Sequence, residues 1–294
     1  MTAYKDIYFD TPDQLRLYAR DYDRGGKQGT PVLCLAGLTR NARDFELLAE
    51  RLSPWRRVIV AEQRGRGRSA YDPKPENYHP GTYAGDMLAL LDHLEIRKIA
   101  IIGTSLGGLM AMLIAAAWPD RVAGILLNDV GPEVDEAGIA TIKTYIDRKP
   151  DVKSWDDAIN DLRSLFGSAF PDYDRAAWEH FARSVFRENA AGVPVLDYDP
   201  KIALNVKNGE SAAPDLWPVF DSLPPIPIAV IRGALSNILP EKTLAEMKRR
   251  RPDLVSAELP RIGHAPRLDE RESLALIGRF LALVDQQTTG QSQK

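Results

Sequence analysis

The sequence predicts an α/β protein, in which a doubly wound and mostly parallel sheet carries an inserted α-helical cap. Strand-type apolar runs alternate with helix-type segments over residues 31–129 and again over residues 226–284, which is typical of a parallel sheet. Residues 133–222 lie between these regions and combine helical periodicity and frequent aromatic residues with no clear buried strand. We therefore expect a sheet core made of residues 1–132 and 223–294, and a helical cap made of residues 133–222.

The composition is that of an ordinary globular chain. Of the 294 residues, 44% are hydrophobic and 27% are charged, and the formal net charge is −3. This balance argues against bulk attraction to nucleic acid or to a membrane surface, so we expect a small-molecule partner and neither of those two. Cys34 is the single cysteine, and its apolar surroundings predict a buried structural thiol. The polar N-terminus without a signal peptide, and the absence of an apolar run near ~20 residues, favour a cytoplasmic location.

The first elements of the core follow in order from residue 4. Residues 4–9 and 14–22 alternate in polarity around the turn Thr11-Pro12-Asp13, which favours an antiparallel hairpin. The next predicted elements are a strand over 31–35, a helix over 41–52 with Asn41 as its N-cap, a strand over 57–61 and a helix over 82–94.

A strand–turn–helix unit stands at the centre of the chain. A strand over 98–102 runs into Gly103-Thr104-Ser105-Leu106-Gly107, and a helix over 106–118 follows at once. This Gly-x-Ser-x-Gly elbow holds a serine hydroxyl at the tip of a sharp turn, beside the amides of a helix N-terminus. Any side chain at the two glycine positions would clash in so tight a turn. Ser105 is therefore the candidate nucleophile.

The remaining elements complete the pattern. A strand over 121–128 ends next to Asp129. The cap is predicted to hold helices over 137–148, 155–166 and 174–188. The second part of the core is predicted to hold strands over 226–232 and 254–259, helices over 241–250 and 272–284, and a polar end over 286–294 that we expect to fray.

A serine nucleophile needs a base within hydrogen-bond reach, and the base needs an orienting group. The four histidines are His79, His93, His180 and His264. His264 alone follows a late strand in a loop with Gly263, which is where a doubly wound hydrolase carries its base. A loop histidine without a role is the alternative, but the serine elbow favours His264 as the base.

The acid that would orient this base is less obvious. The loop after the next-to-last strand holds Ser236 and Asn237 but no carboxylate, and an asparagine cannot offset the charge of an imidazolium. Asp129 follows another strand that ends at the same side of the sheet. We therefore favour Asp129 as the acid, with Ser236 and Asn237 as neutral hydrogen-bond partners near His264, at a displaced or accessory acid position. The alternative is that Asp129 only ties down the turn into the cap.

Two backbone N–H groups are expected to form an oxyanion hole. Leu106, the residue after the nucleophile, supplies one. Leu38 supplies the other, and Gly37 beside it lets that loop approach the serine closely. The arginine-rich loop over 64–69 lacks the Lys-Ser/Thr of a phosphate-binding loop, so we interpret it as a structural loop beside the site. The sequence indicates no cofactor and no metal.

With these motifs the chain resembles the α/β-hydrolase fold superfamily, of the serine esterase type with an inserted helical cap. The resemblance runs from about residue 4 to 284. It rests on Ala36-Gly37-Leu38, the loop 64–69, Gly103-Thr104-Ser105-Leu106-Gly107-Gly108 and Gly263-His264-Ala265-Pro266. It implies that Ser105 is the nucleophile and His264 the base.

The chain departs from the superfamily pattern at Ala36, where His or Pro is common, at Glu62, where Asp is usual, and at the acid position. A branch of small-acyl esterases carries its Asp after the sixth strand and a serine at the usual acid position. Asp129 and Ser236 match that arrangement. The alternative is that Asn237 marks an inactivated variant.

The expected function is hydrolysis of carboxylic esters of small to medium acyl groups through an acyl-enzyme intermediate. A lactonase or a carbon–carbon bond hydrolase would use the same constellation of residues. A non-catalytic ligand-binding protein on the same scaffold is the alternative of another class. The pattern predicts neither the physiological substrate nor the oligomeric state.

Overall fold

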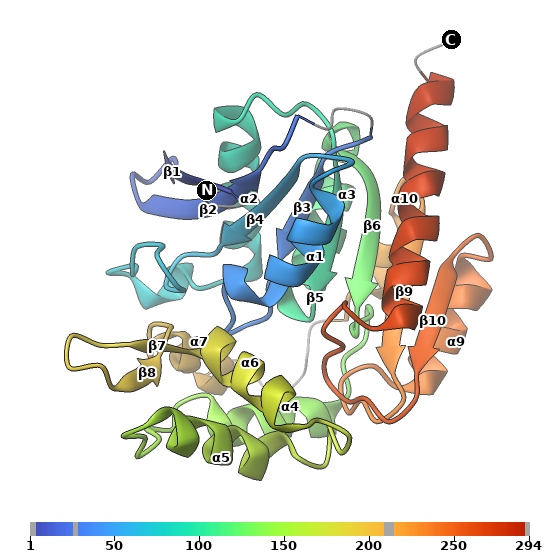
Figure 1. Ribbon diagram of the computed structural model, residues 1–294. Helices are drawn as coiled ribbons and strands as arrows, with labels where there is room; N and C mark the ends of the chain where they lie inside the picture. Colours follow the sequence, from blue (N-terminus) through green and yellow to red (C-terminus); the bar gives the residue numbers. More distant parts are fainter. Residues whose placement is uncertain (1–3, 26–28, 209–214, 292–294) are drawn as a thin grey trace.

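An eight-stranded sheet forms the centre of the computed structural model, which describes residues 4–25, 29–208 and 215–291 (Figure 1). The strand order is β1-β2-β4-β3-β5-β6-β9-β10. The strands are β1 (Lys5–Asp10), β2 (Arg16–Tyr22), β3 (Val32–Leu35), β4 (Val58–Glu62), β5 (Ile99–Thr104), β6 (Val122–Asn128), β9 (Ile228–Gly233) and β10 (Val255–Leu259). β1 pairs with β2, and β2 with β4, in antiparallel fashion, and all the other pairs are parallel. The predicted fold class and the predicted N-terminal hairpin are confirmed.

Helices cover both faces of this sheet. Because side chains alternate along a strand, Leu33 and Leu35 of β3 join the core on one face, while Val32 and Cys34 join the core on the other. The first core includes α2 (Pro80–His93), α3 (Leu106–Ala117) and α9 (Glu241–Arg250); the second includes α1 (Glu46–Leu52) and α10 (Arg271–Gln291). Short 3-10 helices span Ala42–Phe45, Pro75–Asn77 and Pro119–Arg121. Cys34 is buried as expected, and burial raises the pKa of its thiol.

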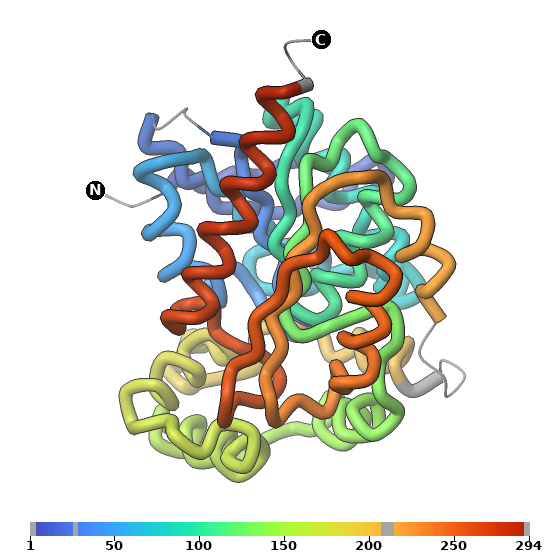
Figure 2. Tube along the Cα trace, turned by 90° about the vertical axis from the view of Figure 1, so that its right-hand side faces the viewer, coloured from blue at the N-terminus to red at the C-terminus, as the bar shows by residue number. Residues whose placement is uncertain are grey.

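The insert (residues 133–222) lies beyond the carboxyl ends of the parallel strands, in the green to yellow part of both views (Figures 1 and 2). Its elements are α4 (Glu136–Tyr145), α5 (Trp155–Phe166), α6 (Arg175–Val185), β7 (Phe186–Glu188), β8 (Pro194–Leu196), α7 (Ile202–Asn208) and α8 (Trp217–Asp221). It has a hydrophobic cluster of its own, in which Phe170, Trp178 and Phe186 are buried. These three aromatic residues therefore help to hold the elements of the insert together.

Three expectations about element ends are wrong, the first being the helix predicted over 137–148, which ends at Tyr145. The helix predicted over 174–188 stops at Val185, because Phe186 turns to extended backbone and pairs with Leu196 in the short β7–β8 hairpin. The frayed end predicted from residue 286 is helical as far as Gln291. There Gln287 Nε2 donates to Pro225 O at 2.6 Å, which ties the polar last turns to the loop before β9.

No helix among the described residues is both long enough and apolar enough to cross a bilayer.

Candidate active site

Ser105 lies at the sharp turn between β5 and α3. Its backbone angles are φ 53° and ψ −117°, a region that non-glycine residues rarely occupy and that costs on the order of 1–3 kcal/mol. A Cβ on Gly103 would lie 2.3 Å from Gly107 C, and a Cβ on Gly107 would lie 2.0 Å from Leu35 O. Both glycines are therefore required for α3 to pack against β3 and β5 at this turn.

Asp129 lies directly after β6, and three donors surround its carboxylate. Oδ1 accepts from Gly233 N at 2.8 Å, and Oδ2 accepts from Ser236 Oγ at 2.6 Å. The same Oδ2 lies 2.7 Å from His264 Nδ1. Asp129 is fully buried, and a buried carboxylate is costly unless hydrogen bonds replace its water. The structure thus brings Asp129 and His264 together, although 135 positions separate them in the chain.

Ser236 and Asn237 have different surroundings. Ser236 Oγ donates to Asp129 and accepts from Ile238 N at 3.1 Å and Leu239 N at 3.2 Å. Asn237 is exposed, and its amide Nδ2 donates to the hydroxyl of Thr141 at 3.1 Å. Asn237 therefore does not have the place near His264 that we expected, because its side chain points to α4 instead. Ser236 contacts the carboxylate of Asp129, which lies against His264.

The loop that holds His264 is fixed from two sides. Gly263 N donates to Ala169 O of the insert at 2.7 Å, and a Cβ on Gly263 would lie 2.6 Å from Ala169 Cβ. On the sheet side, Asn128 Nδ2 donates to Pro266 O at 2.8 Å. The imidazole is therefore held in place by its backbone as well as by its contact with Asp129.

Leu38 and Leu106 are both close to Ser105. Leu106 is the first residue of α3, so helical bonding leaves its N–H without a partner. A Cβ on Gly37 would lie only 3.8 Å from Ser105 Cβ, so the loop that carries Leu38 lies against the serine. Buried Arg66 donates from Nε to Leu38 O at 2.8 Å and holds this peptide.

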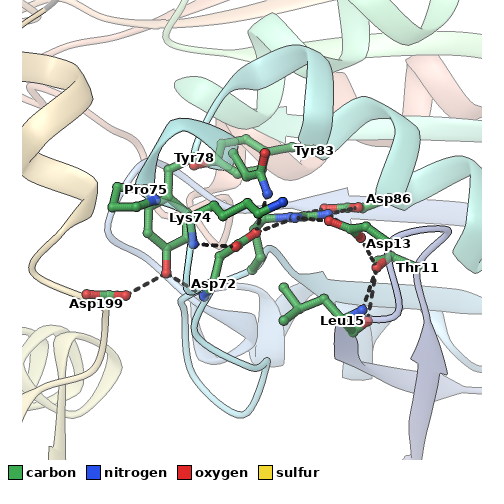
Figure 3. Close-up of polar contacts among 12 residues, drawn as sticks. Thr11, Asp13, Leu15, Asp72, Lys74, Pro75, Tyr78, Tyr83, Asp86 and Asp199 are labelled. Carbon is green, nitrogen blue, oxygen red and sulfur yellow. Dashed lines mark hydrogen bonds and ion pairs between the residues drawn. The ribbon is translucent and has the colours of Figure 1, made fainter.

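In the arginine-rich loop 64–69, Arg64 and Arg68 have carboxylate partners, whereas buried Arg66 bonds to carbonyl and hydroxyl oxygens and keeps Nη2 without a partner among the described residues. The guanidinium of Arg64 bonds to three carboxylates, Asp13, Asp72 and Asp86, which converge in Figure 3. In the same view Tyr78 donates to Asp199 of the insert at 2.6 Å. These contacts agree with our interpretation of a structural loop, which joins the sheet to the insert and supports Leu38.

A cavity of about 160 Å³ opens between the sheet and the insert. Ser105 and His264 line it at the end of the sheet, together with Gly37 and Leu38. The opposite wall comes from the insert and is mainly aromatic: Tyr145, Phe166, Phe170, Tyr173, Phe181 and Tyr198. Ser105, His264 and a largely apolar wall thus share one cavity, as in small-molecule sites.

Charged side chains that the sequence did not single out also line this cavity. They are Arg40, Asp44, Arg148 and Arg267, and His180 lies with them. Arg40 and Arg267 each follow a site motif by two or three positions, in Gly37-Leu38-Thr39-Arg40 and His264-Ala265-Pro266-Arg267. Their positions just after the site motifs could have marked them as candidate site residues in the sequence. That they line the cavity depends on the conformation of the two loops.

Comparison with known proteins agrees with this architecture. The family model for the alpha/beta hydrolase fold matches residues 30–266. A similar relative is the 3-hydroxybutyrate-oligomer hydrolase of Cupriavidus necator, which is 30% identical over 277 residues, covering 90% of this chain and 93% of that protein. The 2-(acetamidomethylene)succinate hydrolase of Mesorhizobium japonicum is 27% identical over 237 residues, covering 80% and 82%. Among solved structures, an alpha/beta hydrolase from Novosphingobium aromaticivorans superposes with a TM-score of 0.91 at 45% identity, covering 96% of this chain and 99% of that one.

Proposed function

The chain belongs to the α/β-hydrolase fold family, and on that basis we propose that this hydrolase cleaves carboxylic esters of small to medium acyl groups through an acyl-enzyme intermediate. In the proposal Ser105 is the nucleophile, His264 the general base and Asp129 the acid that orients it. The insert over 133–222 serves as the cap over the substrate.

One observation carries the proposal: His264, which lines the cavity together with Ser105, has its Nδ1 2.7 Å from the carboxylate of Asp129, which is buried behind it. Because Asp129 is acceptor-only when ionised, Nδ1 carries the proton, and Nε2 is the nitrogen left to accept one. A histidine in this tautomer is the base that a serine hydroxyl needs.

Acylation follows from these positions. Ser105 Oγ attacks the ester carbonyl carbon as His264 Nε2 takes its proton, and the carbonyl oxygen becomes an oxyanion. The N–H groups of Leu38 and Leu106 donate to that oxyanion, and each such donor is worth about 3–4 kcal/mol at the transition state. When the tetrahedral intermediate collapses, the bond to the alkoxide breaks and His264 returns the proton to the leaving alcohol.

Deacylation repeats the sequence with water. His264 Nε2 takes a proton from the water that attacks the acyl-enzyme, and the same two N–H groups bind the oxyanion. Collapse then releases the carboxylic acid, and the proton on His264 goes back to Ser105 Oγ. Asp129 keeps its negative charge throughout and stabilises the imidazolium that forms in each half of the reaction.

The ester class has support from a relative as well as from the site. The Cupriavidus necator protein is named for oligomers of 3-hydroxybutyrate, and such oligomers are joined by carboxylic ester bonds. The intact Asp129–His264 contact favours an enzyme over a non-catalytic binding protein on the same scaffold. Lactones and carbon–carbon substrates stay as alternatives to be assayed beside esters.

The test is the Ser105→Ala variant. We expect p-nitrophenyl acetate and p-nitrophenyl butyrate turnover to fall to the background rate, and labelling by a fluorophosphonate probe to vanish, while the melting temperature stays within a few degrees of wild type. Turnover that survives the substitution would exclude the proposed nucleophile. A wild-type protein that takes no label and turns over no ester would favour the binding protein instead.

A further inference from the structure

Arg267 is the residue of the cavity wall whose bonding is incomplete. Within the described part of the chain, several buried side-chain nitrogen and oxygen atoms have no hydrogen-bond partner. Of the residues with such an atom, Arg267 is the one that lines the cavity. Its unpartnered atom is Nε, whereas its Nη2 bonds to Asp269 at 2.6 Å. Nε is buried although 25% of the Arg267 side chain is exposed, and an unmet donor on a charged group calls for an explanation in a native site.

The other two arginines that line the cavity, Arg40 and Arg148, each have a carboxylate partner in two-point contact. Arg40 bonds through Nε and Nη2 to Asp44 at 2.8 and 2.6 Å, and its Nη2 also bonds to Ser184 at 2.7 Å. Arg148 has both terminal nitrogens on the carboxylate of Asp161. Both guanidinium groups are neutralised by a carboxylate in two-point contact, so neither is ready to receive another anion.

The guanidinium of Arg267 is also fixed in place before any ligand arrives. The backbone N–H groups of Arg267 and Leu268 both donate to the carboxylate of Glu270, at 2.7 and 2.9 Å. The guanidinium carbon lies 5.7 Å from the ring centre of Tyr173, on the aromatic wall of the insert. A cation held between a rigid loop and an aromatic ring loses little entropy on binding an anion.

The charge of Arg267 acts inside the cavity. His180 lies on the same wall, and burial together with the positive charge of Arg267 lowers the pKa of its imidazole. Asp269, which partners Nη2, is one-third exposed, so solvent screens its side of the pair. The positive charge of Arg267 therefore reaches the cavity wall, where the carboxylates of Asp44 and Asp269 oppose its effect on His180.

We propose that the natural substrate is an ester that also carries a free carboxylate, and that the guanidinium of Arg267 binds this carboxylate while Ser105 attacks the ester. This inference rests on the proposed function, since it names the substrate class of the same site. Three peptide links separate Arg267 from His264, so their Cα atoms are at most about 11 Å apart. The ester carbonyl and the carboxylate therefore belong to one short molecule, such as a half-ester of a dicarboxylic acid or an acylated hydroxy acid.

The experiment compares each anionic ester with a neutral ester of similar shape. For a carboxylate on the acyl half, the pair is the p-nitrophenyl monoester of glutaric acid and p-nitrophenyl isoheptanoate. For a carboxylate on the alcohol half, the pair is the butanoyl ester of β-hydroxypropionate and isopentyl butanoate. In the wild type we expect kcat/KM to favour the anion by about tenfold or more in one of the pairs, which is the range for a hydrogen bond to a charged group.

In the Arg267→Met variant we expect that preference to fall to about threefold or less, mainly through KM, while the neutral ester of the pair keeps its rate. The matched control is the double variant Arg148→Met with Asp161→Asn, which removes a charge pair from the same wall without a change in net charge. It should keep the wild-type preference. Thermal unfolding of each variant identifies any that does not fold.

The wild-type comparison decides the matter even if a variant does not fold. Neutral esters hydrolysed as well as anionic ones in both pairs would overturn the inference, and so would a preference that survives in Arg267→Met. In either of those cases fluorophosphonate labelling and turnover of neutral esters would leave the proposed function standing. Absence of turnover with all four esters and absence of labelling would overturn both.

Discussion

Replacement of Asp129 by Asn tests the assignment of the acid most directly, because it keeps the shape of the side chain and removes its charge. The structure predicts how the new amide sits. Gly233 N–H must still find an acceptor, so the amide oxygen takes the place of Oδ1, and the amide nitrogen faces Ser236 Oγ and His264 Nδ1. An amide N–H that donates to Nδ1 drives the imidazole proton to Nε2.

A histidine in that tautomer cannot take the proton of Ser105. We expect kcat to fall by about 10³–10⁴, equivalent to about 4–5 kcal/mol of transition-state stabilisation. KM should change little, because Asp129 does not line the cavity. Initial rates with p-nitrophenyl butyrate measure both parameters, and circular dichroism melts show that the variant is folded.

The matched control is Asn237→Ala, which alters the neighbouring candidate. Asn237 is exposed and bonds to Thr141, so its loss should change kcat by about twofold at most. A larger loss of activity in Asn237→Ala than in Asp129→Asn would refute the assignment of the acid. An Asp129→Asn enzyme that keeps more than about a tenth of its kcat would refute the tautomer argument.

Two further predictions concern the frame around the site. Gly107→Ala should lower the melting temperature sharply or prevent folding, because the new Cβ would lie 2.0 Å from Leu35 O. Gly278→Ala should stabilise the protein slightly, because nothing lies within 4 Å of the new Cβ. Equal melting temperatures of the two variants would contradict this prediction. The hydrogen bond from Arg64 lowers the pKa of Asp13 from 3.8 to about 2 in the folded protein. The ionised Asp13 carboxylate therefore contributes fully to folding stability above pH 3.8, and this contribution is lost as the pH falls through 2. Asp13→Asn should therefore destabilise the protein at pH 5 more than at pH 3 in urea titrations.

Most of the fold could be predicted from the sequence pattern, because most of the parallel strands are apolar runs and helix-type segments alternate with them along the chain. The errors lie where tertiary contacts override local pattern. The β7–β8 hairpin is stabilised by pairing between Phe186 and Leu196, and its two strands are only three residues long. The last turns of α10 are polar and gain their order from a contact with Pro225, which no local pattern reveals.

In the candidate site, Ser105 and His264 were found because each stands in a short motif with its own glycines. The place of Asp129 was argued from chemistry, since a triad needs a charge, and the structure brings its carboxylate to His264. Asn237, next to Ser236 in the chain, was expected nearby and points elsewhere. One peptide unit of difference changes which way a side chain points, and only the loop conformation decides it.

The sequence by itself determined the elbow and the order of the elements, because those depend on a few neighbouring residues and on short-range sterics. Gly103 and Gly107 are demanded by atoms less than 3 Å from where a side chain would begin. Only the tertiary structure decided which carboxylate meets His264 and which arginine of the cavity wall has an unmet donor. Those facts depend on β6 and β9 lying side by side and on the loop after β10 packing against the insert, which bring together residues more than a hundred positions apart.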